Sequence, residues 1–433
     1  MVRLRGLHFR AYPNNYSSMT GQGIRVGYRR CLALLQERLA EPAPGRIQLL
    51  SGPRQVGKTT LLLALAEWLG PIALYAACDG PEASLPGFWE RLWTRAEEIL
   101  AAQGRAVVLL DEAHLLPNWA PRLKGEWDRL RRRRSPVHVV ATGSSALRLA
   151  AGSRESLAGR FERITLTHWS AADVAETFDL PRGEAADLVA RSGSYPGAVP
   201  LRADGPRWTA YVRDAIVEPA IGRDLLALAP IRKPGLLRQV FGVCVASPAQ
   251  IVSLQKIQGQ LHDAGALETI AHYLALLEEA YLVAALPKRS RRLARRRAAP
   301  PKLVVLNQAL LAVADPRGAP DPERDPARFG AWVENACLAH AWNAGQQVTY
   351  WREEPVEVDG VIEGSWGRWL VEVKTGAMSP ADLRGLLECG SRLPGFRPLL
   401  VCDPAGRPAA ERAGIEAVTW QEFLLEGPPG PRG

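Results

Sequence analysis

The chain has 433 residues, too many for one hydrophobic core, so we expect two to four domains. Its composition is that of a globular protein. The N-terminus has no continuous apolar h-region and no run of about 18 apolar residues occurs, so we expect no secretion signal, no membrane span and a cytoplasmic location. The formal net charge of +9 indicates a polyanionic partner wherever the basic residues are concentrated.

A nucleotide-phosphate loop is the first clear motif. The pattern G-x-x-x-x-G-K-[ST] is completed by Gly52, Pro53, Arg54, Gln55, Val56, Gly57, Lys58, Thr59 and Thr60. Residues 47–50 predict a buried strand before it and residues 61–66 a helix after it, which argues against a chance glycine-rich turn. Backbone N–H groups at the two glycines would hold the β-phosphate, Lys58 would reach the β and γ oxygens, and Thr59 would bind Mg²⁺.

A second buried strand, residues 106–110, ends in Asp111 and Glu112. This is the pattern of a Walker B strand, in which Asp111 would hold Mg²⁺ through water and Glu112 would polarise the attacking water. The strand is strong evidence only together with the phosphate loop upstream of it.

Residues 131–134 form a basic run that could face solvent or a phosphate backbone. The strand at 137–141 then leads into Thr142 and Ser144, whose hydroxyls could sense the γ-phosphate, although a serine here could equally cap a helix. Arg160 follows about one helix later. It could act as an arginine finger on a neighbouring subunit's nucleotide, or it could be a structural arginine paired with an acid.

These motifs, in this order and with Gly193-Ser194-Tyr195-Pro196 after them, resemble a prokaryotic family of AAA-type ATPases with a C-terminal nuclease-like domain of unknown function. The resemblance spans residues 28–376 and implies an N-terminal extension (1–27), a P-loop α/β ATPase core (28–168) and a helical lid (169–232). Ser194 replaces a glycine of the family's pattern. The string at 111–114 also suggests a DEAH-box helicase, but the phosphate loop differs and no second RecA-like domain follows.

Residues 233–310 predict a winged helix-turn-helix module. Helices at 236–245, 248–261 and 267–282 precede a basic segment and a strand at 303–306. The basic segment would be the wing and contact DNA phosphates; its cations are Lys288, Arg289, Arg291, Arg292, Arg295, Arg296 and Arg297. The third helix carries only acidic charges, so the module could instead join the ATPase to the C-terminal domain.

Residues 357–363 and 368–374 predict two strands joined by a four-residue turn. With Glu363 opposite Arg368, the register places Val361 opposite Leu370 and Asp359 opposite Glu372. One face, which includes Val358 and Ile362, would be core, and the other would carry the charges. Two facing carboxylates cost stability unless a cation lies between them, and a divalent metal is the leading candidate.

The pattern resembles the PD-(D/E)XK nuclease fold, predicted here over residues 325–425 with a helix at 380–390 and a strand at 396–403. The resemblance implies that Asp359, Glu372 and the helix acid Glu334 bind Mg²⁺ while Lys374 lowers the pKa of an attacking water. A solvated hairpin or a degenerate site that binds without cutting are the alternatives.

The leading hypothesis is a DNA-associated ATPase that uses ATP and Mg²⁺ and forms a homo-oligomer, for which a ring is one arrangement. A Mg²⁺-dependent nuclease regulated by ATP and a nucleotide-dependent switch or adaptor are the alternatives. The six cysteines lack zinc-site spacing and predict reduced, mostly buried thiols.

Overall fold

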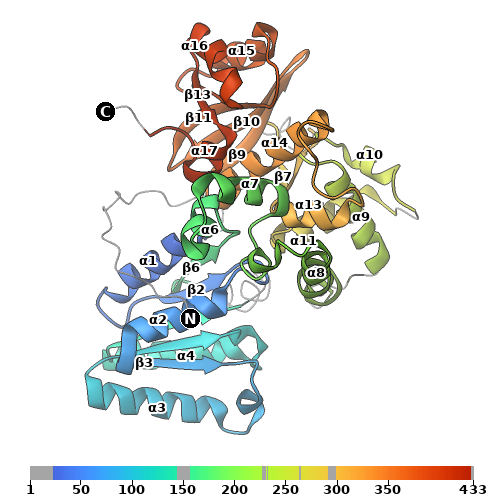
Figure 1. The fold of residues 1–433 in the computed structure, drawn as a ribbon. Helices are drawn as coiled ribbons and strands as arrows, with labels where there is room; N and C mark the ends of the chain where they lie inside the picture. Colours follow the sequence, from blue (N-terminus) through green and yellow to red (C-terminus); the bar gives the residue numbers. More distant parts are fainter. Residues whose placement is uncertain are drawn as a thin grey trace.

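A parallel sheet of six strands forms the core of the N-terminal part of the chain (Figure 1). The computed structural model describes residues 23–143, 157–226, 231, 233–262, 265–290 and 299–430. The strand order is β1-β6-β2-β5-β4-β3, and every neighbouring pair is parallel. The elements are β1 (Ile24–Val26), α1 (Tyr28–Leu39), β2 (Ile47–Ser51), α2 (Lys58–Leu69), β3 (Ala73–Ala77), α3 (Phe88–Gln103), β4 (Ala106–Asp111), α4 (Trp119–Arg133), β5 (Val137–Thr142) and β6 (Phe161–Leu166).

Helices cover both faces of this sheet, because its strands are apolar on both sides. Val107 and Leu109 of β4 point to the face covered by α1 and α2. Val108 and Leu110 point to the opposite face, where α3 and α4 contribute tryptophans and leucines. The predicted mixed α/β fold with a parallel sheet is therefore confirmed.

A helical segment follows the sheet and lies at the centre of the molecule (Figure 1). It contains α6 (Ala171–Phe178), α7 (Arg182–Ser192), α8 (Gly205–Tyr211) and two π-helical turns, Val212–Val217 and Ala220–Leu225. Ser170 and Asp173 form a capping box that starts α6. Gly193 ends α7 with φ +74°, and a Cβ there would lie 2.0 Å from Asn307 Oδ1, so only glycine fits.

The middle segment consists of helices followed by an antiparallel hairpin. Its elements are α9 (Pro234–Ala246), α10 (Leu254–Gln258), α11 (Leu267–Glu279), β7 (Val283–Leu286), β8 (Lys302–Val305) and α13 (Gln308–Ala314). The second helix is much shorter than the predicted 248–261. Ile251 forms a β-bridge to Lys302 instead, and Ser253 caps the helix that begins at the next residue. The basic segment connects β7 to β8, and residues 291–298 of it lie outside the described residues.

The C-terminal segment is built on a five-stranded sheet of order β13-β12-β11-β10-β9. The strands β9 to β11 form an antiparallel meander, whereas β12 and β13 run parallel to β11. Its elements are α14 (Pro326–Asn343), β9 (Gln347–Glu353), β10 (Val356–Gly364), β11 (Gly367–Lys374), α15 (Arg384–Arg392), β12 (Arg397–Cys402), α16 (Arg407–Arg412), β13 (Glu416–Thr419) and α17 (Trp420–Glu426).

The predicted hairpin register is confirmed at Val361↔Leu370 and Glu363↔Arg368, although the turn is shorter than four residues. The assignment of Val358 to the same face as Ile362 is wrong. The register against β9 shifts between Val358 and Val361, so Val358 packs with Val361 and Leu370 under α15. The expected charged face is therefore a second core, and Ile362 faces α14 and α17 on the other side.

All six cysteines are buried and unpaired, as the sequence predicts. Within the described ranges, no helix is both long and apolar enough to cross a membrane.

Candidate functional site

The phosphate loop connects β2 to α2 at the carboxyl edge of the parallel sheet, beside the ends of β4 and β5. Gly57 has φ +90°, a left-handed conformation that glycine adopts without strain. A Cβ at Gly52 would lie 2.1 Å from the carbonyl oxygen of Leu166. Both glycines are therefore required by the path of the backbone.

Lys58 begins α2 and lies beneath this loop. Its ammonium donates to the carbonyl oxygens of Pro53 (2.8 Å) and Gly52 (3.1 Å), and the residue is only 6% exposed. Burial lowers the pKa of Lys58, whereas the carboxylates of Glu112 and Asp111 raise it. Thr59, the next residue, is exposed.

Asp111 ends β4, and hydrogen bonds hold both of its carboxylate oxygens. Oδ1 accepts from the Thr142 hydroxyl at 2.6 Å, and Oδ2 accepts from the Tyr75 hydroxyl at 3.0 Å. Thr142 Oγ1 also accepts from the backbone N–H of Glu112 at 3.0 Å. Sequence reasoning missed Tyr75, which lies on β3, the neighbour of β4 in the sheet.

Glu112 directly follows the strand with φ +51°, and His114 Nδ1 lies 3.2 Å from its Oε2. Thr59 and Asp111 lie on neighbouring elements and supply the oxygen donors that Mg²⁺ prefers, so these residues fit the ion. Bound there with nucleotide, Mg²⁺ would neutralise charge on the phosphates. Ser144, the other predicted sensor, lies outside the described residues.

Arg54 connects the phosphate loop to the helical segment. Its Nε and Nη2 donate to the two oxygens of Asp224 at 2.8 and 2.7 Å, a bidentate pair. Asp224 lies on the second π-helical turn, 170 residues away. A nucleotide phosphate and Asp224 would therefore compete for the same guanidinium.

The structure places Arg160 in the arrangement of the structural alternative. Its Nε donates to Asp128 Oδ1 at 2.9 Å, and its guanidinium lies 5.5 Å from the centre of the Trp127 ring. An arginine finger would have to give up this pair.

His168 connects the parallel sheet to the middle segment. Its Nε2 lies 3.0 Å from the Tyr281 carbonyl oxygen, and its Nδ1 lies 3.1 Å from the Asn307 amide nitrogen. Both contacts are satisfied when the ring is neutral, with the proton on Nε2. Burial lowers the pKa of His168 to about 4.

We expect protonation of His168 to destabilise the folded chain as the pH falls below 6.5. The pKa of His168 is about 4 in the folded chain, against an ordinary value of 6.5, so the unfolded chain takes up the proton first and acid favours unfolding. The loss should reach about 3 kcal/mol once the pH is below both values. Denaturant unfolding across this range should show a shallower pH dependence for His168→Gln than for wild type or for His262→Gln. Equal slopes in all three would contradict the prediction.

The structure brings four predicted residues of the C-terminal segment together and adds a fifth, Lys302 of β8. Lys302 Nζ lies 2.7 Å from Glu334 Oε1 and 3.2 Å from Asp359 Oδ1. Asp359 Oδ2 accepts from the backbone N–H of Val373, and Lys374 Nζ lies 3.0 Å from Glu372 Oε1. The ammonium of Lys302 therefore contacts two of the three carboxylates that were expected to bind a metal, whereas Glu372 pairs with Lys374.

The protonation states of this cluster follow from burial and mutual repulsion. Burial, and then the charge of Asp359, raises the pKa of Glu334 and of Glu372 to about 8. For Asp359, burial alone would raise the pKa. The positive charges of Lys302 and Lys374 outweigh burial and hold the pKa of Asp359 below its usual value. In the described ranges, no group of three His, Cys, Asp or Glu side chains is placed to hold a metal ion. The three carboxylates do not fit a bound Mg²⁺ in this arrangement.

Two residues of the predicted wing contact the C-terminal sheet. The Arg289 guanidinium pairs with Glu363 and lies 5.3 Å from the centre of the Phe396 ring. Its backbone N–H donates to the Tyr350 carbonyl oxygen at 2.6 Å, next to a bridge between Lys288 and Tyr350. This is the packing role that the sequence left open. The predicted DNA-contacting arginines at 291, 292 and 295–297 lie outside the described residues.

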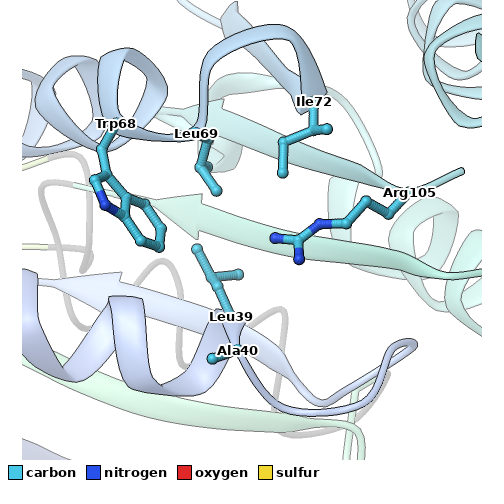
Figure 2. Close-up of a pocket in the computed structure, with 6 residues that line it drawn as sticks. All are labelled: Leu39, Ala40, Trp68, Leu69, Ile72 and Arg105. Carbon is cyan, nitrogen blue, oxygen red and sulfur yellow. The ribbon is translucent and has the colours of Figure 1, made fainter. Parts of the chain in front are cut away.

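An open hollow of about 430 Å³ lies at the other edge of the parallel sheet (Figure 2). Leu39, Trp68, Leu69 and Ile72 line it together with Arg105, which precedes β4. None of the predicted nucleotide-site residues borders this hollow.

Comparison with known proteins matches three parts of the chain to families. Residues 44–175 match an AAA domain, residues 185–321 a domain of unknown function (DUF8612), and residues 329–423 another domain of unknown function (DUF4143). Uncharacterized proteins of Mycobacterium bovis and Mycobacterium tuberculosis are each 28% identical over 356 residues, which cover 80% of this chain and 74% of theirs.

Among solved structures, the Aeropyrum pernix ORC1 protein in complex with DNA is similar at 14% identity and a TM-score of 0.26, covering 66% of this chain and 90% of that one. A similarity of this degree supports no conclusion about fold or ligand. The family match and the geometry of the phosphate loop agree, and the chain therefore carries an AAA-type ATPase domain.

Proposed function

We propose that this chain couples Mg²⁺-dependent ATP hydrolysis to the binding, remodelling or processing of DNA. The observation that carries the hydrolytic part is the position of Asp111 and Glu112 beside the phosphate loop. Thr142 contacts both residues, and Tyr75 holds the second oxygen of Asp111. Lys58 would stabilise the phosphates, and Glu112 would orient the attacking water.

We further propose the division into an N-terminal extension (1–27), ATPase core (28–168), lid (169–232), winged-helix module (233–310) and nuclease-like domain (325–425). Three helices followed by an antiparallel hairpin support the winged-helix assignment. The succession of α14, a three-stranded meander, α15 and a parallel strand supports the nuclease-like one.

DNA contact is proposed for the segment between β7 and β8, because basic residues are concentrated there. Arg289 is engaged by Glu363, so five arginines beyond it would contact phosphates. We expect substitution of Arg291, Arg292, Arg295, Arg296 and Arg297 by glutamine to weaken DNA binding at every sequence. The negative slope of log affinity against log salt concentration should become shallower by about 0.9 for each phosphate contact to duplex DNA that is lost.

The matched control replaces the exposed basic run Arg131, Arg132, Arg133 and Arg134 by glutamine. Fluorescence anisotropy over a salt series would measure both variants, and the ATPase rate would be recorded with single-stranded, duplex and branched DNA. Stimulation by one DNA form identifies the partner. Unchanged affinity in the five-arginine variant, or an equal loss in the control, contradicts the assignment of the wing.

A nucleotide-dependent switch or adaptor is the second candidate. The position of Lys302 favours it over a Mg²⁺-dependent nuclease, because an ammonium already satisfies Glu334 and Asp359. In such a protein, ATP would change the contacts of Arg54 with Asp224, and the C-terminal domain would bind without cutting.

We also propose a homo-oligomer, in which Arg160 would act on a neighbouring subunit's nucleotide. In that role Arg160 would have to leave Asp128. The negative charge of a nucleotide bound to the neighbouring subunit would favour this change of partner.

A further inference from the structure

The acidic cluster of the C-terminal sheet contains a lysine contributed by another part of the chain. Lys302 is the first residue of β8 in the middle segment, and its side chain is 2% exposed. Its ammonium lies within 3.2 Å of Glu334 on α14 and of Glu357 and Asp359 on β10. One cation from the hairpin thus contacts three carboxylates from two elements of the neighbouring sheet domain.

The geometry of these contacts is that of an ammonium group. An ammonium has three N–H donors, and the three carboxylate oxygens lie at 2.7, 3.1 and 3.2 Å from Nζ. These are hydrogen-bond lengths, whereas Mg²⁺ requires oxygens at about 2.0–2.1 Å in a near-octahedral arrangement. The other oxygen of Asp359 is occupied by the Val373 N–H. A metal bound by Glu334 and Asp359 together would need the position that the Lys302 ammonium holds.

The backbone of Lys302 gives this side chain little freedom to leave. Lys302 pairs with Leu286 across the hairpin and bridges to Ile251 on its other side. The next three residues of β8 are fully buried. Displacing the ammonium would also leave three carboxylates close together in a buried site, which is costly.

We infer that Lys302 is the resident cation of this cluster, that it excludes divalent metal, and that the cluster joins the hairpin to the C-terminal sheet instead of cutting DNA. This inference goes beyond ATP hydrolysis and does not depend on it. It follows that removing Lys302 should create a divalent-metal site that the wild-type chain lacks.

The test uses the full chain without nucleotide. Every protein in it carries Asp111→Asn, because this substitution removes the carboxylate expected to hold metal in the ATPase domain. Mn²⁺ is the probe, and its binding is followed by isothermal titration and by the thermal unfolding temperature. The chain with Lys302 intact should bind no Mn²⁺ at the cluster. Lys302→Ala should gain one Mn²⁺ site, and adding Asp359→Asn should remove it again. Lys302→Arg is the matched control that keeps the positive charge and should gain nothing.

The inference would be overturned if the chain with Lys302 intact bound Mn²⁺ and lost that binding on Asp359→Asn. This comparison can be made even if Lys302→Ala does not fold. A folded Lys302→Ala that takes up no Mn²⁺ would overturn it too. Both readouts are independent of ATPase rate and of DNA binding, so the inference and the proposed function can fail separately.

Discussion

Replacing Lys58 by alanine should reduce ATP hydrolysis by about two to three orders of magnitude, the usual cost of removing a charged donor from a developing phosphate charge. Lys58 is buried beneath the phosphate loop, and its ammonium now donates to the loop carbonyls of Gly52 and Pro53. Nucleotide phosphates would replace these neutral acceptors with charged ones, which bind an ammonium more strongly. The substitution should therefore weaken nucleotide binding as well as catalysis.

Glu112→Gln separates the two effects. Glutamine keeps the size of the side chain, and the Glu112 backbone N–H can still donate to Thr142. It cannot polarise water as a carboxylate does. We expect near-normal ATP affinity with a strongly reduced turnover number, measured by phosphate release and by binding of a fluorescent nucleotide. The exposed Lys256→Ala serves as the control for a lost lysine. If Lys58→Ala hydrolyses ATP as fast as this control, the site assignment is wrong.

The sequence was sufficient to predict that Asp111 and Thr142 come together at the end of neighbouring strands, because these parts are local. The phosphate loop is one continuous motif, and the two strands that deliver Asp111 and Thr142 are apolar runs with polar residues at their ends. Strands of this type form parallel sheets, whose carboxyl ends meet at one edge. Tyr75 escaped prediction because it lies within its strand, where an aromatic residue is expected to pack rather than to hold a carboxylate.

The C-terminal cluster was only partly predictable. The spacing of Asp359, Glu372 and Lys374 on two paired strands is a local pattern, and the register up to Gly360↔Val371 follows from the turn. The shift between Val358 and Val361 depends on pairing with β9, which the hairpin sequence does not reveal. Lys302 is 57 residues from Asp359, and a lysine at the start of an apolar strand normally indicates an exposed end.

A cation was expected between Asp359 and Glu372. The structure instead gives each carboxylate its own ammonium, Lys302 beside Asp359 and Lys374 beside Glu372. A sequence pattern shows which side chains would repel one another within a hairpin. The position of the Lys302 ammonium cannot be found in this way, because it is set by how the middle segment packs against the C-terminal sheet.

Lys302→Met should destabilise the folded chain by about 3–5 kcal/mol, the usual cost of removing one partner from a buried ion pair. Methionine fills the volume of the lysine stem, so the loss would come mainly from Glu334, Glu357 and Asp359, which would lie close together with no ammonium among them. A second substitution, Asp359→Asn, should recover part of the loss because it removes the carboxylate whose pKa is held lowest in wild type. Lys374→Met, whose side chain is 36% exposed, is the matched control and should cost less.

The pH dependence of this loss identifies its cause. Without the ammonium, mutual repulsion raises the carboxyl pKa values of the folded chain further than in wild type, so the folded variant binds more protons than the folded wild type. The difference in unfolding free energy between Lys302→Met and wild type should therefore grow as the pH rises from roughly 5 to 8. Taking this difference cancels the opposite effect of His168, which both chains share. Urea unfolding at several pH values measures it, and a deficit that stays constant with pH would indicate lost packing instead of unbalanced charge.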